Sequence, residues 1–569
     1  MYKEGISLRE EIQQKEERII LQLPGKSVEI PVGRTLLQIA SEVKKEYSSP
    51  IVGAVFNNIL IDLYKEISGP GKLEFLDLQL ENGMRIYRQS LVFLLAKAAY
   101  ELNPVNSIVV KHALGKSYYC EIKGKKAVSP LEVIELEAKM RELVAADEPI
   151  IPHMLTRAEA AEILARFDRQ NTIEILDIMW FEKVRIYSSG PYSGYSYSYL
   201  APSTGCLTVF KLVPHNNGFL LCFPDSQKPA VVAPCPKLPK LGQVWEESQE
   251  WAKILGISDL AGFWRLVAKN PQEANNLIHI GEALQEKKIA KIADEIFAKR
   301  EKLRVILIAG PSSSGKTTFA QRLSIQLRVL GLHPVSVSTD DYFVDREHTP
   351  RDEFGDFDFE ALEAVDVQLF NEHLQLLMEC CEVECPIYNF QKGGRELQGK
   401  ITRVDKDHPI IVEGIHALNE RLTPMIKREN KYKIYISALT QTFIDDHNRI
   451  QTTDARLIRR IVRDNQFRAH DAVKTLQRWP SVRRGEEKNI FPYQEDADMM
   501  FNSALVYELS IFKKYAEPLF MAISSNEKEY SDARRLLDLL SFFPLLPDKN
   551  VPLNSILREF IGGSSIHGN

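Results

Sequence analysis

The sequence GPSSSGKT at residues 310–317 constrains the fold of this chain more than any other feature. It fits the pattern G-x4-G-K-[ST] at every defined position. The apolar run VILIA (305–309) precedes it, and a helix-type pattern follows. In such a context the glycines let backbone N–H groups turn inward around phosphate oxygens, and the first turn of the helix adds its dipole. The motif therefore predicts a nucleoside triphosphate held between a strand and a helix.

The side chains of this loop suggest individual roles. Lys316 neutralises phosphate charge, and the Thr317 hydroxyl is offered to a magnesium ion. We predict that the nucleotide is bound by Gly310, Ser312, Ser313, Ser314, Gly315, Lys316, Thr317 and Thr318. The predicted cofactors are ATP and Mg²⁺.

Acidic residues follow two further strand-like runs. From Leu303 onward such runs alternate with helical segments, which predicts a parallel sheet with crossover helices. In these sheets the ligand lies beyond the carboxyl ends of the strands. Asp340 is therefore placed to take a proton from an acceptor hydroxyl, and Glu413 to lie beside the magnesium. The alternatives are that Asp340 or Asp341 caps a helix and that Glu413 is a solvated strand end.

A strongly basic stretch lies at residues 449–484, which contain ten Lys and Arg but only three acidic residues. Arg456, Arg460 and Arg463 are spaced i, i+4, i+7 and so share one helical face. Guanidinium groups there are suited to clamping a transferred phosphoryl group. A nucleic-acid patch and a purely solvated charged helix are the alternatives.

Composition limits the other functions. The net charge of −5 gives the whole molecule no attraction for nucleic acids or anionic membranes, so any anion site is local. The apolar runs are far shorter than the roughly 20 residues of a membrane span. With no secretory signal at the amino terminus, the chain is predicted to be cytoplasmic, and its seven cysteines to be reduced thiols.

The pattern along the chain predicts a multidomain α/β and α+β protein. The expected divisions are a tail (1–16), a small α+β domain (17–84), a second α+β domain (85–242), a helical connector (243–302), an α/β domain with a parallel sheet flanked by helices (303–530) and a C-terminal segment (531–569).

Residues 303–525 resemble the uridine kinase and phosphoribulokinase family of P-loop kinases. The resemblance rests on GPSSSGKTT (310–318), STDDYF (338–343), GDFDFEALEAVD (355–366), PIYNF (386–390), VEGIHAL (412–418), RLIRRIVRD (456–464) and the PYQEDADMMF stretch ending at Phe501. It implies that Asp340 is the catalytic base, that Asp358 and Tyr388 hold the acceptor, and that Glu413 lies near the magnesium. It also implies that Arg460, Arg463 and Arg468 form a lid over the phosphates, with Arg460 binding the nucleotide and the other two acting in catalysis. Asn389 and His470 depart from the family pattern.

Residues 17–80 look like the TGS domain of threonyl-tRNA synthetases, which has a β-grasp-like fold. The join IYRQSLVFLLAKA (86–98) and SYYCEI (117–122) resemble the editing-type domain that follows it there. Gln89 and Phe93 stand where that domain carries a histidine pair, and APSTGCL (201–207) lacks its later Cys/His pair. The resemblance therefore implies that the shape is retained without the editing chemistry.

These features together predict a phosphotransferase that transfers the γ-phosphate of ATP to a hydroxyl group of a small molecule, with a uridine- or cytidine-like nucleoside as the first expected acceptor. The alternatives are another sugar-containing acceptor and a translation-linked, RNA-binding NTPase. An RNA or amino-acid-like ligand of the N-terminal half and a homo-oligomer stay open, and no membrane partner is expected.

Overall fold

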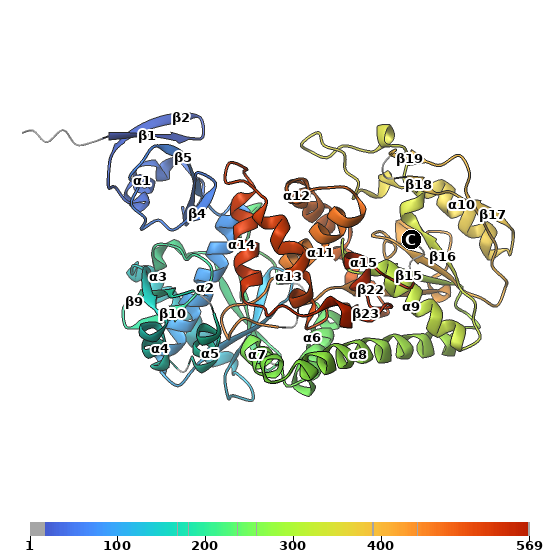
Figure 1. The fold of residues 1–569 in the computed structure, drawn as a ribbon, viewed down its shortest axis with the longest axis horizontal. Helices are drawn as coiled ribbons and strands as arrows, with labels where there is room; N and C mark the ends of the chain where they lie inside the picture. The colour runs from blue at the N-terminus through green and yellow to red at the C-terminus, as the bar shows by residue number, and fades with distance from the viewer. Residues whose placement is uncertain are drawn as a thin grey trace, which may run out of the picture.

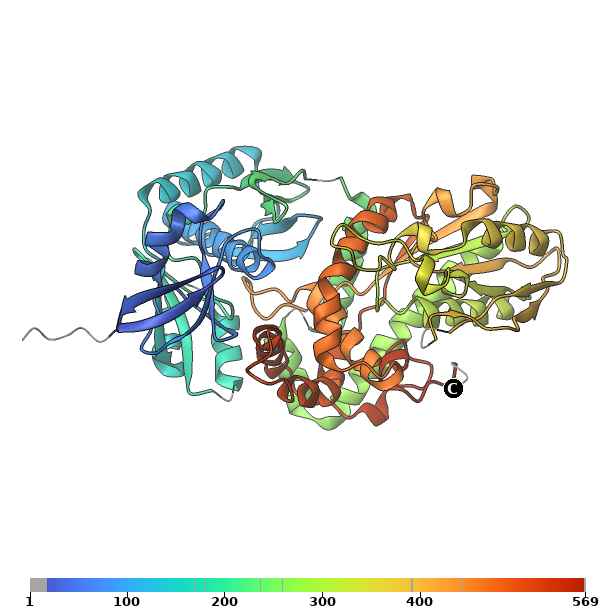
Figure 2. The ribbon, with the colours of Figure 1, turned by 90° about the horizontal axis from the view of Figure 1, so that it is seen from above.

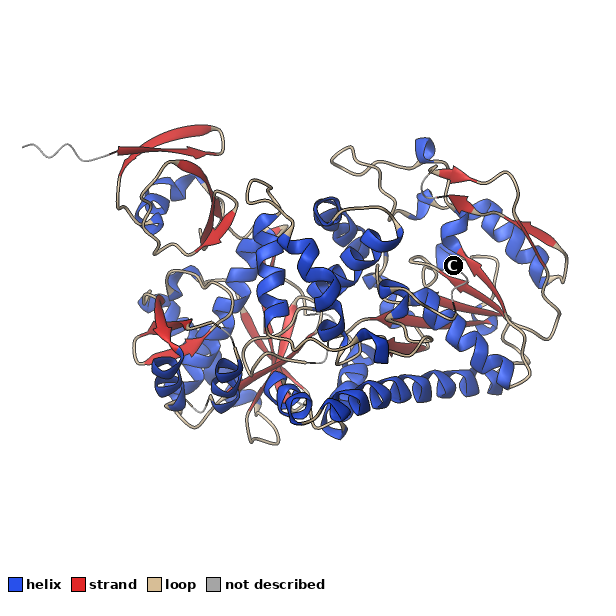
Figure 3. Cartoon of the chain, in the orientation of Figure 1, coloured by secondary structure: helices blue, strands red, loops and turns tan. Residues whose placement is uncertain are grey.

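The computed structural model of the protein describes residues 18–167, 169–179, 181–235, 237–257, 259–389, 392–440 and 442–566. Two smaller domains lie on one side of the molecule and an α/β domain on the other, with helices between them (Figures 1 and 3). The predicted tail, residues 1–16, falls outside the described residues. None of the helices in the described ranges combines the length and the low polarity that a bilayer span demands.

The first domain is a mixed sheet that packs against one helix. Its elements are β1 (Arg18–Leu23), β2 (Lys26–Pro31), α1 (Leu36–Val43), β3 (Gly53–Phe56), β4 (Ile59–Ile61) and β5 (Gly71–Leu76), with the strand order β2-β1-β5-β3-β4. The central strands β1 and β5 are parallel, and the other pairs are antiparallel. Side chains of β1 alternate between solvent and core, as a sheet with one covered face requires. The predicted β-grasp-like arrangement is present.

The second domain is built around a long buried helix, α2 (Glu81–Leu102). Its first antiparallel sheet has the order β11-β12-β7-β6 and its second the order β10-β9-β8. The elements after α2 are β6 (Ile108–Ala113), β7 (Ser117–Ile122), α3 (Pro130–Ala146), β8 (Ile151–Thr156), α4 (Arg157–Ala165), α5 (Gln170–Ile178), β9 (Lys183–Ser189), β10 (Tyr192–Tyr195), β11 (Lys211–His215), β12 (Gly218–Cys222), β13 (Pro224–Asp225) and β14 (Lys228–Val232). Because α2 is covered on nearly all sides, it forms the core of this domain.

One expectation about the cysteines is wrong. Cys222, at the end of β12, forms a disulfide with Cys235. The spacing of 13 residues gave no signal of this, because the pairing depends on the turn of β13 and β14 bringing the two positions together. The other five cysteines of the chain are free thiols.

Three helices join the two sides of the molecule: α6 (Pro239–Ile254), α7 (Leu260–Lys269) and α8 (Pro271–Ala298). The long helix α8 runs along the lower edge of the molecule in Figure 1 and packs against α9 of the α/β domain. Ile289, Ile292, Ala293 and Ile296 are among its buried residues. A buried arginine of α9, Arg322, reinforces the contact through ion pairs with α8.

The C-terminal domain contains the predicted parallel sheet. Its strands are β15 (Val305–Ala309), β16 (Val335–Ser338), β21 (Ile410–Glu413), β22 (Lys431–Ser437) and β23 (Met499–Asn502), in the order β16-β21-β15-β22-β23. The main helices are α9 (Lys316–Val329), α10 (Val367–Met378), α11 (Thr452–Phe467), α12 (Ala472–Asn489), α13 (Glu508–Met521), α14 (Tyr530–Ser541) and α15 (Arg558–Ile561). Two small hairpins pair β17 (Val383–Cys385) with β20 (Lys400–Thr402) and β18 (Tyr388–Asn389) with β19 (Gly394–Arg395). Because β15 is buried at every residue, the loop that follows it starts from a fixed point.

A loop between β22 and α11 enters the second domain, and we call its residues 442–450 the inserted loop. The amide N–H of Val110 donates to the carbonyl of Asp446 at 2.8 Å. The side-chain amide of Gln89, on α2, donates to Oδ1 of Asn448 at 3.1 Å. The two sides of the molecule are therefore joined by segments far apart in the sequence, and the orange and red part of the chain lies between them in Figure 2.

The first turn of α11 carries a second such junction. Asp454 is buried and accepts from Arg85 of α2 at 3.1 Å and from Arg535 of α14 at 2.7 Å. Although burial opposes ionisation, Arg535 and Arg85 hold the pKa of Asp454 below its usual value. The start of α11 is therefore tied by charge to both neighbours.

Asp454→Asn is expected to destabilise the protein. Removing one partner of a buried ion pair costs about 3–5 kcal/mol, because the remaining charge stays buried without compensation. The midpoint of thermal unfolding should fall clearly, whereas the exposed Asp405→Asn should leave it nearly unchanged. Equal midpoints for the two variants would contradict the importance of this junction.

Candidate active site

The loop at residues 310–315 has a backbone that only small residues allow. Gly315 has a φ of +83°, in the left-handed region that favours glycine. A Cβ on Gly310 would lie 2.0 Å from the carbonyl oxygen of Ile436, on the adjacent strand β22. Lys316 begins α9, and its ammonium donates to the carbonyl of Gly310 at 3.0 Å. The loop thus has the shape of a phosphate cradle, with the lysine folded back over it.

Helix α11 holds this loop from behind. Arg456 donates to the Ser312 carbonyl at 3.0 Å, and Arg459 to the Ser313 carbonyl at 3.3 Å. Both arginines are buried, and each is paired with a buried glutamate, Arg456 with Glu486. The expectation that Arg456 joins a phosphoryl clamp is therefore wrong, because its guanidinium already binds the loop carbonyl and Glu486.

The two predicted carboxylates lie at neighbouring strand ends. Glu413, the last residue of β21, accepts hydrogen bonds from the hydroxyls of Thr317 at 3.3 Å and Ser338 at 3.1 Å. Burial, together with the nearby carboxylate of Asp340, raises the pKa of Glu413 to about 7, against the opposing charge of Lys316. Because two carboxylates line one cavity beside the cradle, a bound cation is favourable there.

The adjacent aspartates have different surroundings. Asp340 lies in the short 3-10 helix Thr339–Tyr342 after β16, and its backbone N–H donates to the Ser338 hydroxyl. It lines the same cavity as Lys316. The carboxylate of Asp341 turns away and accepts the Tyr388 amide N–H at 3.3 Å. Of the pair, the structure thus presents Asp340 to a ligand and uses Asp341 to hold a neighbouring loop.

The cradle opens into a cavity of about 580 Å³, a volume suited to a nucleotide. Its walls come from the P-loop, from the ends of β16 and β21, from the end of α11 and from the C-terminal segment. The lining residues named in our predictions are Ser313, Ser314, Gly315, Lys316, Thr317, Asp340, Glu413, Arg463 and Arg468. Residues that the sequence predicts from separate motifs are therefore brought together.

Three arginines crowd around one carboxylate at the end of α11. Arg460, Arg463 and Arg468 all pair with Asp464, at 3.3, 2.7 and 3.8 Å. Arg460 also donates to the Ser312 hydroxyl at 2.6 Å. The Arg463 charge and burial lower the pKa of Arg468 to about 10. The cavity is lined by Lys316, Arg463, Arg468 and Arg558 and also by Asp340, Glu413 and Glu559, so an anion that enters it meets both cations and carboxylates.

The two predicted acceptor residues do not line this cavity. Tyr388 is buried and packs edge-on against Phe343, with ring centroids 5.6 Å apart. Asp358 accepts the backbone N–H of Glu360 at 3.1 Å. Their role in acceptor binding stays a prediction.

Glu360 is a residue that the sequence analysis missed. Burial raises the pKa of its carboxyl group, against the opposing charges of Arg460 and Lys316, and one of its oxygens is buried without a hydrogen-bond partner. It belongs to the 355–366 motif, but nothing in the spacing separates it from its acidic neighbours. Glu360 lies against Gly485 of α12 and does not line the cavity, so its effect on the site is through charge.

The chain's own groups fit a magnesium ion. No cluster of three or more His, Cys, Asp or Glu side chains suited to a metal occurs within the described ranges. Mg²⁺ however usually takes only one or two carboxylates, with water and phosphate oxygens as its other ligands. Thr317 and Glu413, whose oxygens already meet, supply such a partial set.

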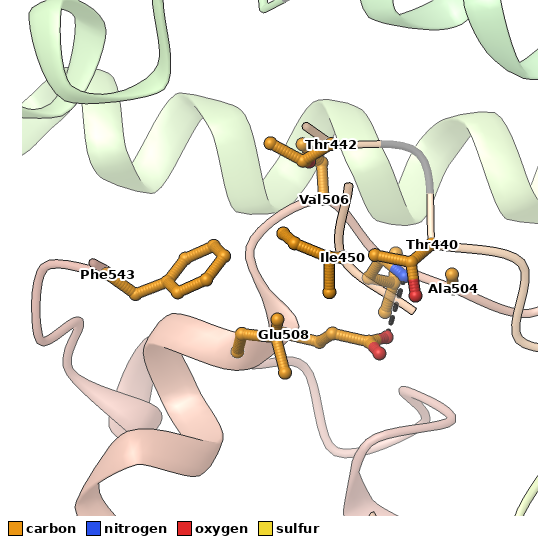
Figure 4. Close-up of a pocket in the computed structure, with 9 residues that line it drawn as sticks. Thr440, Thr442, Ile450, Ala504, Val506, Glu508 and Phe543 are labelled. Carbon is orange, nitrogen blue, oxygen red and sulfur yellow. Dashed lines mark hydrogen bonds between the residues drawn. The ribbon is translucent and has the colours of Figure 1, made fainter. Parts of the chain in front are cut away.

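A second cavity is far smaller, about 10 Å³. It lies between the inserted loop and the start of α13, with Thr440, Ile450 and Glu508 among its walls (Figure 4). This volume suits about one water molecule. We therefore regard it as a small packing gap and not as a ligand site.

Comparison with known proteins identifies the C-terminal domain. Residues 305–510 match the model of the Phosphoribulokinase / Uridine kinase family. The C-terminal domain belongs to this family.

Among solved structures, the chain matches a possible uridine kinase from Bacillus stearothermophilus, at 18% identity over 38% of this chain and 98% of that one, with a TM-score of 0.27. Another is the D-glycerate 3-kinase from Cryptococcus neoformans, at 13% identity over 46% of this chain and 89% of that one, with a TM-score of 0.21.

The N-terminal part matches threonine–tRNA ligases instead. The enzyme from Syntrophomonas wolfei is 27% identical over 190 residues, which are 33% of this chain and 30% of that protein. The enzyme from Enterococcus faecalis is 29% identical over 183 residues, 32% of this chain and 28% of that protein. The chain thus spans less than a third of the length of these relatives.

The raised pKa of Glu413 predicts a stability that depends on pH. Between its ordinary value of 4.5 and about 7, the folded protein keeps a proton on Glu413 that the unfolded chain releases. Stability of the metal-free protein should therefore fall as the pH rises through this window. Between about pH 5 and about pH 8, the free energy of unfolding of Glu413→Gln should rise by about 1 to 2 kcal/mol relative to that of the wild type. This value is reduced because the residue is partly exposed to solvent.

Denaturant unfolding of the metal-free protein at several pH values measures this difference. The exposed Glu527→Gln is the matched control, and its difference from the wild type should not change with pH. A flat profile for Glu413→Gln as well would show that Glu413 ionises normally.

Proposed function

We propose that the protein is an ATP-dependent kinase that phosphorylates a hydroxyl group of a nucleoside, with a uridine- or cytidine-like acceptor as the first candidate. One observation carries the proposal: Asp340 lines the same cavity as the phosphate cradle, Glu413 and two arginines at the C-terminal end of α11, Arg463 and Arg468. A carboxylate placed beside a phosphate cradle is suited to orienting a hydroxyl for in-line attack.

In the proposed reaction, Asp340 accepts the proton of the acceptor hydroxyl as its oxygen forms a bond to the γ-phosphorus. The bond between that phosphorus and the bridging oxygen breaks, and ADP leaves. Lys316, Arg463 and Arg468 stabilise the charge that spreads over the transferred group. Arg460 binds the nucleotide beside the loop serines.

Magnesium, held on the protein side by Thr317 and Glu413, would neutralise charge on the phosphate oxygens. Since the hydroxyls of Thr317 and Ser338 already fix one oxygen of Glu413, the carboxylate is oriented before any ligand arrives. Catalysis therefore rests mainly on positioned charge, as is typical of phosphoryl transfer.

The proposal is tested by incubating the full-length protein with ATP, Mg²⁺ and a panel of nucleosides and other sugar-containing alcohols. A nucleoside should stimulate ADP formation and become phosphorylated. Asp340→Asn should lower kcat by about 10²- to 10⁴-fold, the usual contribution of a general base, and still bind ATP. Asp405→Asn serves as the control on an exposed carboxylate. Stimulation by a non-nucleoside sugar alone would move the proposal to the alternative acceptor class.

The likeness of the N-terminal part to threonine–tRNA ligases favours a second candidate function, RNA or amino-acid binding by a translation-linked NTPase. Two contacts argue against it. Gln89 is engaged by Asn448 of the inserted loop, and Phe93 packs against Tyr192 with ring centroids 5.2 Å apart. Both positions, which carry the histidine pair in the editing-type domain that this region resembles, are thus used in internal packing.

We therefore expect transfer RNA to bind no more tightly than non-specifically, with a Kd of about 10⁻⁴ to 10⁻⁶ M at physiological salt. Titration of the full-length protein with labelled tRNA at two salt concentrations measures this. A much tighter complex would favour the second candidate.

A further inference from the structure

Residues 548–566, the last described part of the C-terminal segment, lie against the phosphate cradle. They follow the stretch that matches the family, residues 305–510. Arg558, Glu559 and residues 562–564 line the 580 Å³ cavity. In the kinase domain the nucleotide cavity is thus closed by a part of the chain that the family model does not cover.

The carboxylate of Glu559 sits on the first turn of α9. Its Oε2 accepts hydrogen bonds from the Thr318 backbone N–H at 3.2 Å and from the Thr318 hydroxyl at 2.7 Å. The N–H groups of a first helical turn lack partners within the helix, and here they belong to the phosphate cradle. Glu559 therefore places an anionic oxygen where a phosphate oxygen of a nucleotide is expected.

The segment is fixed in place apart from this side chain. Ile556, Leu557 and Phe560 are fully buried. Ile556 covers Gly315, since a Cβ on that glycine would lie 2.5 Å from its Cγ2. The Arg459 guanidinium, which braces the loop, also lies 5.2 Å from the ring centroid of Phe560. The segment is thus anchored by buried side chains, whereas Glu559 is half-buried and reaches Thr318 from the cavity wall.

The electrostatics of the cavity favour such an exchange. Glu559 adds to Asp340 and the burial that raise the pKa of Glu413, so three carboxylates act on one region. A nucleotide brings further negative charge to the same place. Charge-assisted hydrogen bonds are strong, but two anions cannot share the Thr318 donors at low cost.

We propose that Glu559 is an internal competitor for the nucleotide phosphates: its carboxylate occupies the Thr318 donors in the free protein and is displaced when a nucleoside di- or triphosphate binds. The side chain thereby lowers nucleotide affinity and keeps the cradle filled with an anion in the absence of nucleotide. This inference rests on the proposed binding of a nucleotide at the P-loop.

Calorimetric titration of the full-length protein with ADP and, separately, with adenosine tests the inference. Glu559→Gln should bind ADP about tenfold more tightly than the wild type, since the neutral amide is a weaker competitor and repels no phosphate. Adenosine, which carries no phosphate, should bind both proteins equally. Glu527→Gln, at an exposed position, should match the wild type with both ligands.

A second variant, Glu559→Asp, distinguishes competition for the Thr318 donors from charge repulsion between the carboxylate and the phosphates. It also gives an independent result if Glu559→Gln folds poorly. The shorter side chain keeps the charge but reaches the Thr318 donors less well, so ADP should bind more tightly than to the wild type and less tightly than to Glu559→Gln. Equal or weaker ADP binding by both variants would overturn the inference and make Glu559 a neutral wall or a nucleotide contact. If the wild type binds no ADP at all, the proposed function fails instead.

Discussion

The buried carboxylate of Glu486 holds the backbone of the phosphate cradle in place. It is fully buried, accepts the backbone N–H of Ser312 at 3.0 Å and is paired with Arg456 and with Arg483. Arg456 in turn holds the Ser312 carbonyl. Both backbone polar groups of Ser312 are thus satisfied by side chains of helices α11 and α12, which lie outside the strand and helix that flank the loop. A buried carboxylate of this kind is favourable only while both arginines stay in place.

Helix α11 links this brace to the rest of the molecule. Within its 16 residues α11 carries Asp454, which is bound to the second domain and to α14, then Arg456 and Arg459, which hold the loop, and near its end Arg463 of the cavity; Arg468 follows directly as the C-cap. A shift of the helix start would therefore move the groups behind the cradle and those in front of it together. In this way the N-terminal half contributes to the geometry of a site that it does not touch.

The sequence predicts the parts of the site that are local, because a motif fixes both the residue types and the backbone around them. The loop at 310–317 and the acidic ends of β16 and β21 are of this kind. Asp340 and Asp341 are adjacent and chemically identical, and only the path of the chain to Tyr388 shows which of them faces the cavity. Glu486 reaches Ser312 of the loop from 174 residues away and Glu559 reaches Thr318 of α9 from 241 residues away, separations over which no spacing rule operates.

In the N-terminal half, the resemblance to a synthetase domain and the observed contacts have different implications. Likeness to a synthetase domain suggests a ligand cleft, but a cleft needs polar groups that are free to meet the ligand. Here Gln89 donates to the inserted loop, and Phe93 is covered by Tyr192. Val110, at the edge of the nearby sheet, gives its backbone N–H to the same loop. The surface that resembles an editing site therefore fits a segment of the kinase domain, and the contacts favour a structural role in which the second domain positions α11.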